Sequence, residues 1–227
     1  MTEIELSEDA DVPVALRLRT VRGRPAPAAP FLLEGQVAVG TPTTRRLTAA
    51  DAGPDDELAG FIAAESARWD YYLTALSCTF VSLEEAELAS GWLRITLSGE
   101  ESTAHSMDPM VLEEFADLSY SIKLVVPLMI ESEFGVNGAR KRRRTAVEGL
   151  YDGTRTPSWL FHGSARAPVH GVQRLRLVVR TPAGLPAEGT IQAGASVRHK
   201  RLGLDLFSYT TPLADVPEPL RIRFLPD

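Results

Sequence analysis

The feature of this sequence that most constrains its fold is an alternation of apolar and polar residues with a period of two, which recurs along most of the chain. The clearest example is the segment 118–130, where every second residue is apolar. Ser119, Ser121 and Lys123 occupy alternate positions at its start. Because successive side chains of a β-strand point to opposite faces, this pattern predicts a strand with one buried face.

Similar alternation predicts further strands on both sides of this segment. We expect them at 12–21, 31–39, 84–98, 159–165, 172–181, 190–199, 202–209 and 220–225. Within 84–98 the apolar positions shift by one residue across Ser90-Gly91. Such a shift indicates either one strand with a bulge or two separate strands.

One segment has helical periodicity instead. Between residues 55 and 69 apolar residues recur at three- and four-residue spacing, and Asp55, Asp56 and Glu57 supply the negative charge that a helix N-terminus favours. We therefore predict a single helix near 55–69. Its end is left open, because the next segment, 71–81, is rich in aromatic and β-branched residues that favour strands.

Short strands without helices between them predict a mainly β protein with an antiparallel β-sandwich-like architecture. We divide the chain into an acidic tail, a β-rich N-terminal part with one helix, a basic hairpin or connection, and a β-rich C-terminal part. The four ranges are 1–11, 12–134, 135–156 and 157–227. The two β-rich parts either form two packed domains or one continuous domain.

Composition places the protein among soluble globular chains. It has 227 residues and a single cysteine, Cys78, whose apolar neighbours predict a small core residue. The N-terminus has neither the basic nor the apolar region of a secretory signal, so we expect a cytoplasmic location. The scarcity of lysine among the basic residues suggests a bacterial source.

Charge is distributed unevenly along the chain. The first eleven residues carry five acidic residues and no basic one, namely Glu3, Glu5, Glu8, Asp9 and Asp11. Five consecutive basic residues follow much later, namely Arg140, Lys141, Arg142, Arg143 and Arg144. The dipeptide Asn137-Gly138 directly precedes this basic run and predicts a type I′ hairpin turn, with the basic run on the returning arm.

The two charged segments are the leading candidates for a binding site. Opposite charges at these two places suit an intramolecular latch, head-to-tail self-association or contact with an acidic protein partner. The alternative is that the basic run is simply a solvated part of a hairpin. Nucleic acid is disfavoured, because few aromatic residues for base stacking lie near the basic run. The leading hypothesis is a non-catalytic interaction or assembly protein that forms a homo-oligomer or binds a protein partner.

Catalytic motifs are absent from the sequence, and we expect neither an enzyme nor a cofactor. There is no GxSxG, no phosphate-binding glycine loop and no histidine or cysteine pair with metal-ligand spacing. A dispersed site around 105–117 remains an alternative, because His105 and Asp108 there precede further carboxylates. His162 and Ser164 are too close in sequence to suggest a catalytic pair.

A second alternative is a membrane-active β protein that inserts a hairpin formed by 118–150. The first arm has the alternating pattern that a membrane-crossing hairpin requires. The second arm carries the five basic residues, which would have to cross the membrane or stay at its surface.

Overall fold

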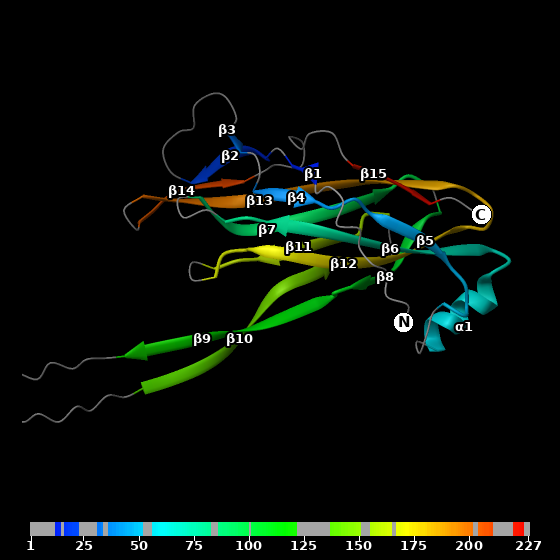
Figure 1. Ribbon diagram of the computed structural model, residues 1–227, viewed down its shortest axis with the longest axis horizontal. Coiled ribbons are helices and arrows are strands. Elements are labelled where there is room, and N and C mark those ends of the chain that lie inside the picture. The colour runs from blue at the N-terminus through cyan, green and yellow to red at the C-terminus, as the bar shows by residue number, and fades with distance from the viewer. Residues whose placement is uncertain are drawn as a thin grey trace, which may run out of the picture.

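The chain forms two antiparallel β-sheets packed face to face, with one short helix at one end, in a computed structural model (Figure 1). The expected mainly β, sandwich-like fold is therefore confirmed. The structure describes residues 12–14, 16–22, 31–33, 36–51, 56–82, 86–99, 101–121, 137–150, 155–164, 167–201, 204–210 and 220–224.

The smaller sheet has six strands. In spatial order they are β1 (Val12–Pro13), β4 (Val37–Val39), β6 (Trp69–Phe80), β12 (Gly171–Pro182) and β8 (Thr103–Asp108), with β5 (Thr43–Leu47) also paired to β6. The larger sheet has nine. They are β3 (Phe31–Leu33), β2 (Leu16–Arg22), β14 (Leu204–Thr210), β13 (Ala187–Arg201), β7 (Ala86–Leu97), β11 (Ser158–His162), β10 (Asn137–Leu150) and β9 (Val111–Ser121), with β15 (Leu220–Phe224) paired to β13.

The core lies between the two sheets and follows the alternation of the sequence. On β12 the residues Leu175, Leu177 and Val179 are buried, while the arginines between and beside them are partly or fully exposed, as predicted. Phe80 of β6 and Phe161 of β11 meet across the core, with ring centroids 4.7 Å apart. Each large apolar side chain buried in this way contributes about 1.5–3 kcal/mol to stability.

Strands from the two β-rich parts of the sequence alternate in both sheets. β6 pairs with β12 over twelve residues, and β7 pairs with β13. The predicted C-terminal strands all form, within a few residues of their expected ends. The predicted bulge in β7 is also confirmed, because Ser90 and Leu88 face consecutive residues of β13 and leave Ala89 as the extra residue.

Two predicted N-terminal strands each divide between the sheets. The segment 12–21 becomes β1 in the smaller sheet and β2 in the larger one, and 31–39 divides into β3 and β4 in the same way. Alternation alone could not show these crossings, because a strand that changes sheets keeps one face toward the shared core.

The helix is shorter than predicted. α1 runs over Asp56–Glu65, and the backbone N–H of Arg68 donates to the Glu65 carbonyl in the turn that follows. Trp69, placed in the helix by its spacing, instead begins β6 opposite Pro182. The aromatic side chains at Trp69 and Tyr71 are buried against Ile62 of α1, so packing under the helix ends it before the tryptophan.

Candidate functional site

The strands β9 and β10 form a two-stranded ribbon that projects away from the rest of the molecule (Figure 1). They pair antiparallel, from Val111 opposite Glu148 at the root to Ser121 opposite Asn137 at the far end. Only the last four residues of β10, from Val147 to Leu150, also pair with β11. The ribbon is therefore the edge of the larger sheet extended beyond the sandwich.

The pairing corrects the predicted hairpin turn. Asn137 and Gly138 are the first two residues of β10, paired with Ser121 and Tyr120, so they do not form the turn. An Asn-Gly pair favours a tight turn locally, but the register of a hairpin is set by all of its cross-strand pairs together. Of the predicted strand 118–130, residues 122–130 lie outside the described residues.

A corner of the chain anchors the root of the ribbon. Between β8 and β9 the chain passes at Pro109 from the smaller sheet to the larger one. The buried Trp159 donates its indole N–H to the carbonyl oxygen of Pro109 at 3.1 Å, and the backbone N–H of Gly149 donates to that of Met110 at 2.7 Å. These bonds tie the start of β9 to both β11 and β10.

A β-bulge marks the place where the ribbon leaves the sandwich. Thr145 faces Glu113 and Val147 faces Leu112, so Ala146 is an extra residue on β10. A bulge of this kind bends its strand and increases the local twist. The part of β10 that precedes Ala146 therefore diverges from the sheet together with β9.

Both edges of the ribbon are open among the described residues. β9 pairs only with β10, and β10 has no second neighbour between residues 137 and 146. Four apolar side chains at the root are also exposed, by 43–59%: Met110, Val111, Leu112 and Leu150. Open strand edges beside exposed apolar residues are typical of surfaces that pair with another chain.

The basic run lies on the returning arm, as predicted. Arg140 to Arg144 are consecutive residues of β10, opposite Leu118 to Glu114 of β9. The pairing places Lys141 opposite Asp117 and Arg144 opposite Glu114. The acidic tail, residues 1–11, lies outside the described residues, so its predicted contact with the basic run stays a prediction.

The predicted alternative site at 105–117 divides between two elements. His105 is the extra residue of a bulge in β8, and its ring packs edge-on against Phe61 of α1 and Tyr71 of β6, at 5.5 and 5.3 Å between centroids. Asp108 is exposed at the end of the same strand. Among the described residues, no three histidine, cysteine or acidic side chains are grouped so that they could hold a metal ion.

Next to His105, Tyr71 donates a hydrogen bond from its hydroxyl to Glu65 Oε2 at 2.8 Å. Burial of the phenol, together with this hydrogen bond and the charge of Glu65, raises the pKa of Tyr71 to about 12. The hydroxyl therefore stays protonated and holds the end of α1 to the sheet.

His162 and Ser164, the other pair considered, do not act on each other. His162 Nε2 lies 3.2 Å from Glu148 Oε2 across β11 and β10, and Ser164 Oγ accepts a hydrogen bond from the backbone N–H of Ala167. The pair of His162 and Glu148 was not predicted, because only the register of the strands brings the two residues together.

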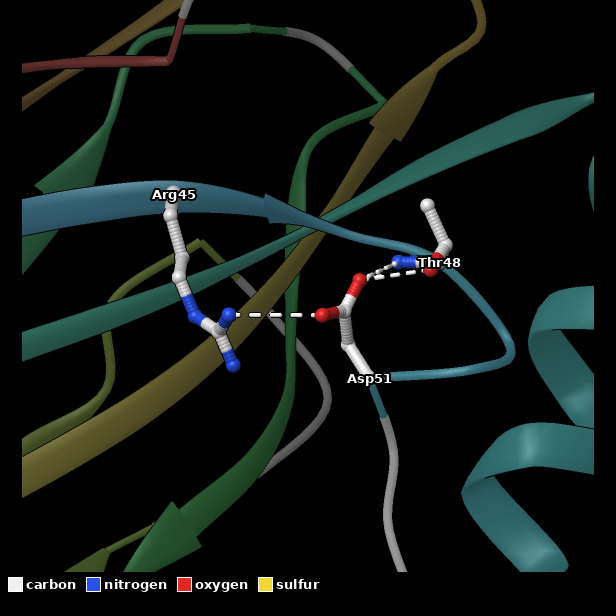
Figure 2. Close-up of polar contacts among 3 residues, drawn as sticks. All are labelled: Arg45, Thr48 and Asp51. Carbon is white, nitrogen blue, oxygen red and sulfur yellow. Dashed lines mark hydrogen bonds and ion pairs between the residues drawn. The ribbon is translucent and has the colours of Figure 1, made fainter. Parts of the chain in front are cut away.

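A partly exposed polar cluster closes the turn after β5 (Figure 2). Asp51 accepts hydrogen bonds from the backbone N–H and the hydroxyl of Thr48, and it pairs with Arg45 at 3.4 Å. The hydrogen bonds from Thr48, reinforced by the Arg45 charge, lower the pKa of Asp51. All three residues serve the turn between β5 and α1, so we assign them a structural role.

No family model matches the sequence, and no curated protein matches it. Among solved structures the chain is similar to the NetB toxin of Clostridium perfringens in its membrane-inserted form, with 5% identity over 95% of each chain and a TM-score of 0.36. It is also similar to a structure described as a pore forming protein, with 7% identity, a TM-score of 0.30, and coverage of 84% of this chain and 90% of that one. At these TM-scores neither similarity defines the function of this chain. No helix in the described residues is long and apolar enough to cross a membrane.

Proposed function

We propose that this protein is a self-assembling, membrane-active β protein that inserts the hairpin formed by residues 118–150. The observation that supports this proposal is the projecting ribbon with two open edges, whose far end leads into the most apolar alternating segment of the sequence. The ribbon projects without any covering element among the described residues (Figure 1).

The register of the ribbon predicts the two faces of the inserted hairpin. We propose that in the membrane the pairing of Ser121 with Asn137 continues toward residue 129, which is halfway between them. Residues directly opposite each other in such a pair share a face. One face then carries Ile122 with Val136, Leu124 with Phe134, and Val126 with Ser132, while Leu128 and Ile130 belong to the turn. The other carries Lys123 with Gly135, Val125 with Glu133, and Pro127 with Glu131.

These two faces fit the opposite sides of a membrane-crossing ribbon. The first is apolar except for Ser132 and suits lipid, whereas the second bears one lysine and two glutamates and suits an aqueous interior. The apolar face begins at the pair of Tyr120 and Gly138, because Arg140 stands opposite Leu118. Each arm therefore offers about nine residues, within the roughly 9–11 that a tilted strand needs to cross a bilayer.

Insertion of a single ribbon would leave backbone groups without hydrogen bonds in the hydrocarbon. The edge of β9 and the outer edge of β10 can satisfy these groups by pairing with the ribbons of neighbouring copies. Such head-to-tail contacts close into a ring when the rotation between copies allows it. The exposed apolar residues at the root, Met110 to Leu112, would be covered by the same contact.

The proposal retains one part of the leading sequence hypothesis, namely a non-catalytic protein that self-associates. It moves the contact from the charged segments to the edges of the ribbon. The contact of the acidic tail with the basic run, and the cytoplasmic location, stay predictions that the described residues do not test.

Two neighbouring valines provide the test. In the proposed register Val126 faces lipid and Val125 faces water, so an arginine enters the hydrocarbon only at Val126, where it costs up to about 2–4 kcal/mol. We expect the wild type and Val125→Arg to release dye from vesicles of equal parts phosphatidylcholine and phosphatidylglycerol, and Val126→Arg to release at least tenfold less. Circular dichroism and sedimentation of the soluble protein check that both variants fold. Absence of dye release by the wild type, or equal loss in both variants, would overturn the proposal.

A further inference from the structure

The basic run is the strongest local charge of the chain, and membrane insertion alone does not explain it. Its five residues occupy consecutive positions of β10, between the far end of the ribbon and the bulge at Ala146. In this register Arg140, Arg142 and Arg144 stand opposite Leu118, Ala116 and Glu114. The basic run is therefore placed between the sandwich and the segment proposed to cross the membrane.

Alternation along the strand divides the basic run between the two faces of the ribbon. Arg140, Arg142 and Arg144 are even-numbered, like Gly138 and Val136, so they continue the face that the proposed hairpin turns toward lipid. Lys141 and Arg143 continue the other face, where Asp117 is the residue opposite Lys141. We call the face proposed to contact lipid the outer face. On β10 this face changes from apolar to basic between residues 138 and 140.

The position of this change corresponds to the surface of a bilayer. When the apolar residues of the outer face lie in the hydrocarbon, the next residues on that face lie at the level of the lipid headgroups. Arginine binds phosphate oxygens with two parallel hydrogen bonds, and each basic residue near an anionic leaflet strengthens binding about fivefold. Tyr120, opposite Gly138, lies at the boundary, where tyrosine is commonly found.

We infer that Arg140, Arg142 and Arg144 form a headgroup-binding band that selects membranes rich in anionic phospholipids. This inference rests on the proposed insertion of the hairpin. The partner is the lipid surface itself, recognised by the phosphate groups and net negative charge of its headgroups. The residues Lys141 and Arg143 take no part in this selection, because they belong to the face turned away from lipid.

The test compares two double variants that remove the same charge from opposite faces. Arg140→Gln with Arg142→Gln alters the outer face, and Lys141→Gln with Arg143→Gln alters the other. Binding and dye release are measured on vesicles of phosphatidylcholine alone and on vesicles of equal parts phosphatidylcholine and phosphatidylglycerol, at low and high salt. Circular dichroism verifies the fold of each variant.

We expect the wild type to bind the anionic vesicles at least tenfold more strongly than the neutral ones at low salt, and less so at high salt. The outer-face variant should lose about 30-fold in binding to anionic vesicles, while the other variant stays close to the wild type. Equal action of the wild type on both kinds of vesicle would overturn the inference and leave the proposed function intact. Equal losses in both variants would also overturn it, because charge alone would then decide binding. A wild type inactive on both vesicles would overturn the inference together with the proposed function.

Discussion

At the scale of single residues, the close packing of the sandwich depends on a glycine in β7. A side chain at Gly91 would place its Cβ 2.5 Å from the Phe80 ring, which is fully buried between the sheets. Gly60 on α1 is a matched control, because it is exposed and a Cβ there would meet nothing within 4 Å. Gly91 therefore allows the close approach of Phe80 in the core, whereas packing does not require a glycine at position 60.

We predict that Gly91→Ala lowers the free energy of unfolding by about 1–3 kcal/mol, since the core must shift to accept the methyl group. Gly60→Ala should raise it by roughly 0.5–1 kcal/mol, because alanine loses less backbone entropy in a helix. Urea denaturation of both variants and the wild type measures these changes. A Gly91→Ala variant as stable as the wild type would show that Phe80 has room to move.

The second prediction at this scale concerns pH. Because the pKa of Tyr71 is raised to about 12 in the fold and is about 10 in an unfolded chain, the folded state holds a proton that the unfolded state loses. The stability from this group is complete below pH 10 and is lost as the pH rises through 12. Tyr71→Phe should therefore have a shallower loss of stability over this range than the wild type.

Urea unfolding at pH 9, 10 and 11 gives the free energy of unfolding of both proteins at each pH. The slope of this free energy against pH reports how many more protons the folded state holds than the unfolded state. Glu65→Gln is the second variant, since it removes the carboxylate charge that disfavours the tyrosinate while keeping a hydrogen-bond acceptor. Its slope should lie between those of the wild type and Tyr71→Phe. Parallel slopes for all three proteins would contradict a protonated Tyr71 in the fold.

At the scale of elements, the sequence predicts strands well because alternation is a local property of each strand. The position of the bulge near Ser90 could be read from the same property, since an extra residue exchanges the two faces. The hairpin turn at Asn137-Gly138 could not, because a two-residue signal competes with eleven cross-strand pairs that set the register. The end of α1 was misplaced for a similar reason, since Trp69 keeps helical spacing while it pairs with Pro182.

For the candidate site too, local features of the ribbon could be predicted from sequence, whereas features set by distant contacts could not. The basic run on the returning arm was predicted from sequence, but the predicted strand 118–130 overlaps β9 only at 118–121. The open edges, the corner at Pro109 and the bulge at Ala146 come from contacts between distant residues. The register matters most, because it decides which of two neighbouring residues, such as Val125 and Val126, faces lipid. A shift of one residue would exchange the faces and reverse the expected behaviour of the two arginine variants.

At the scale of the whole molecule, the acidic tail and the basic run carry opposite charges that bear on membrane binding. The first eleven residues carry five negative charges, and the basic run carries five positive charges at the level proposed for lipid headgroups. If the acidic tail binds the basic run in solution, it competes with anionic lipid for the same residues. The tail would then hold the protein in a state that does not bind membranes until lipid displaces it.

We predict that deletion of residues 1–11 strengthens binding to anionic vesicles at low salt and changes self-association in solution. Both effects should vanish between 50 mM and 500 mM salt, where the screening length falls from about 14 Å to about 4 Å. Vesicle flotation and sedimentation velocity measure them, and replacement of the five acidic residues by their amides in the full chain is the control that keeps its length. Identical binding and sedimentation of the full-length and shortened chains at every salt concentration would exclude both the latch and head-to-tail contact through the tail. The ribbon edges would then be the remaining surfaces for assembly, and the basic run would contact lipid without competition from the chain itself.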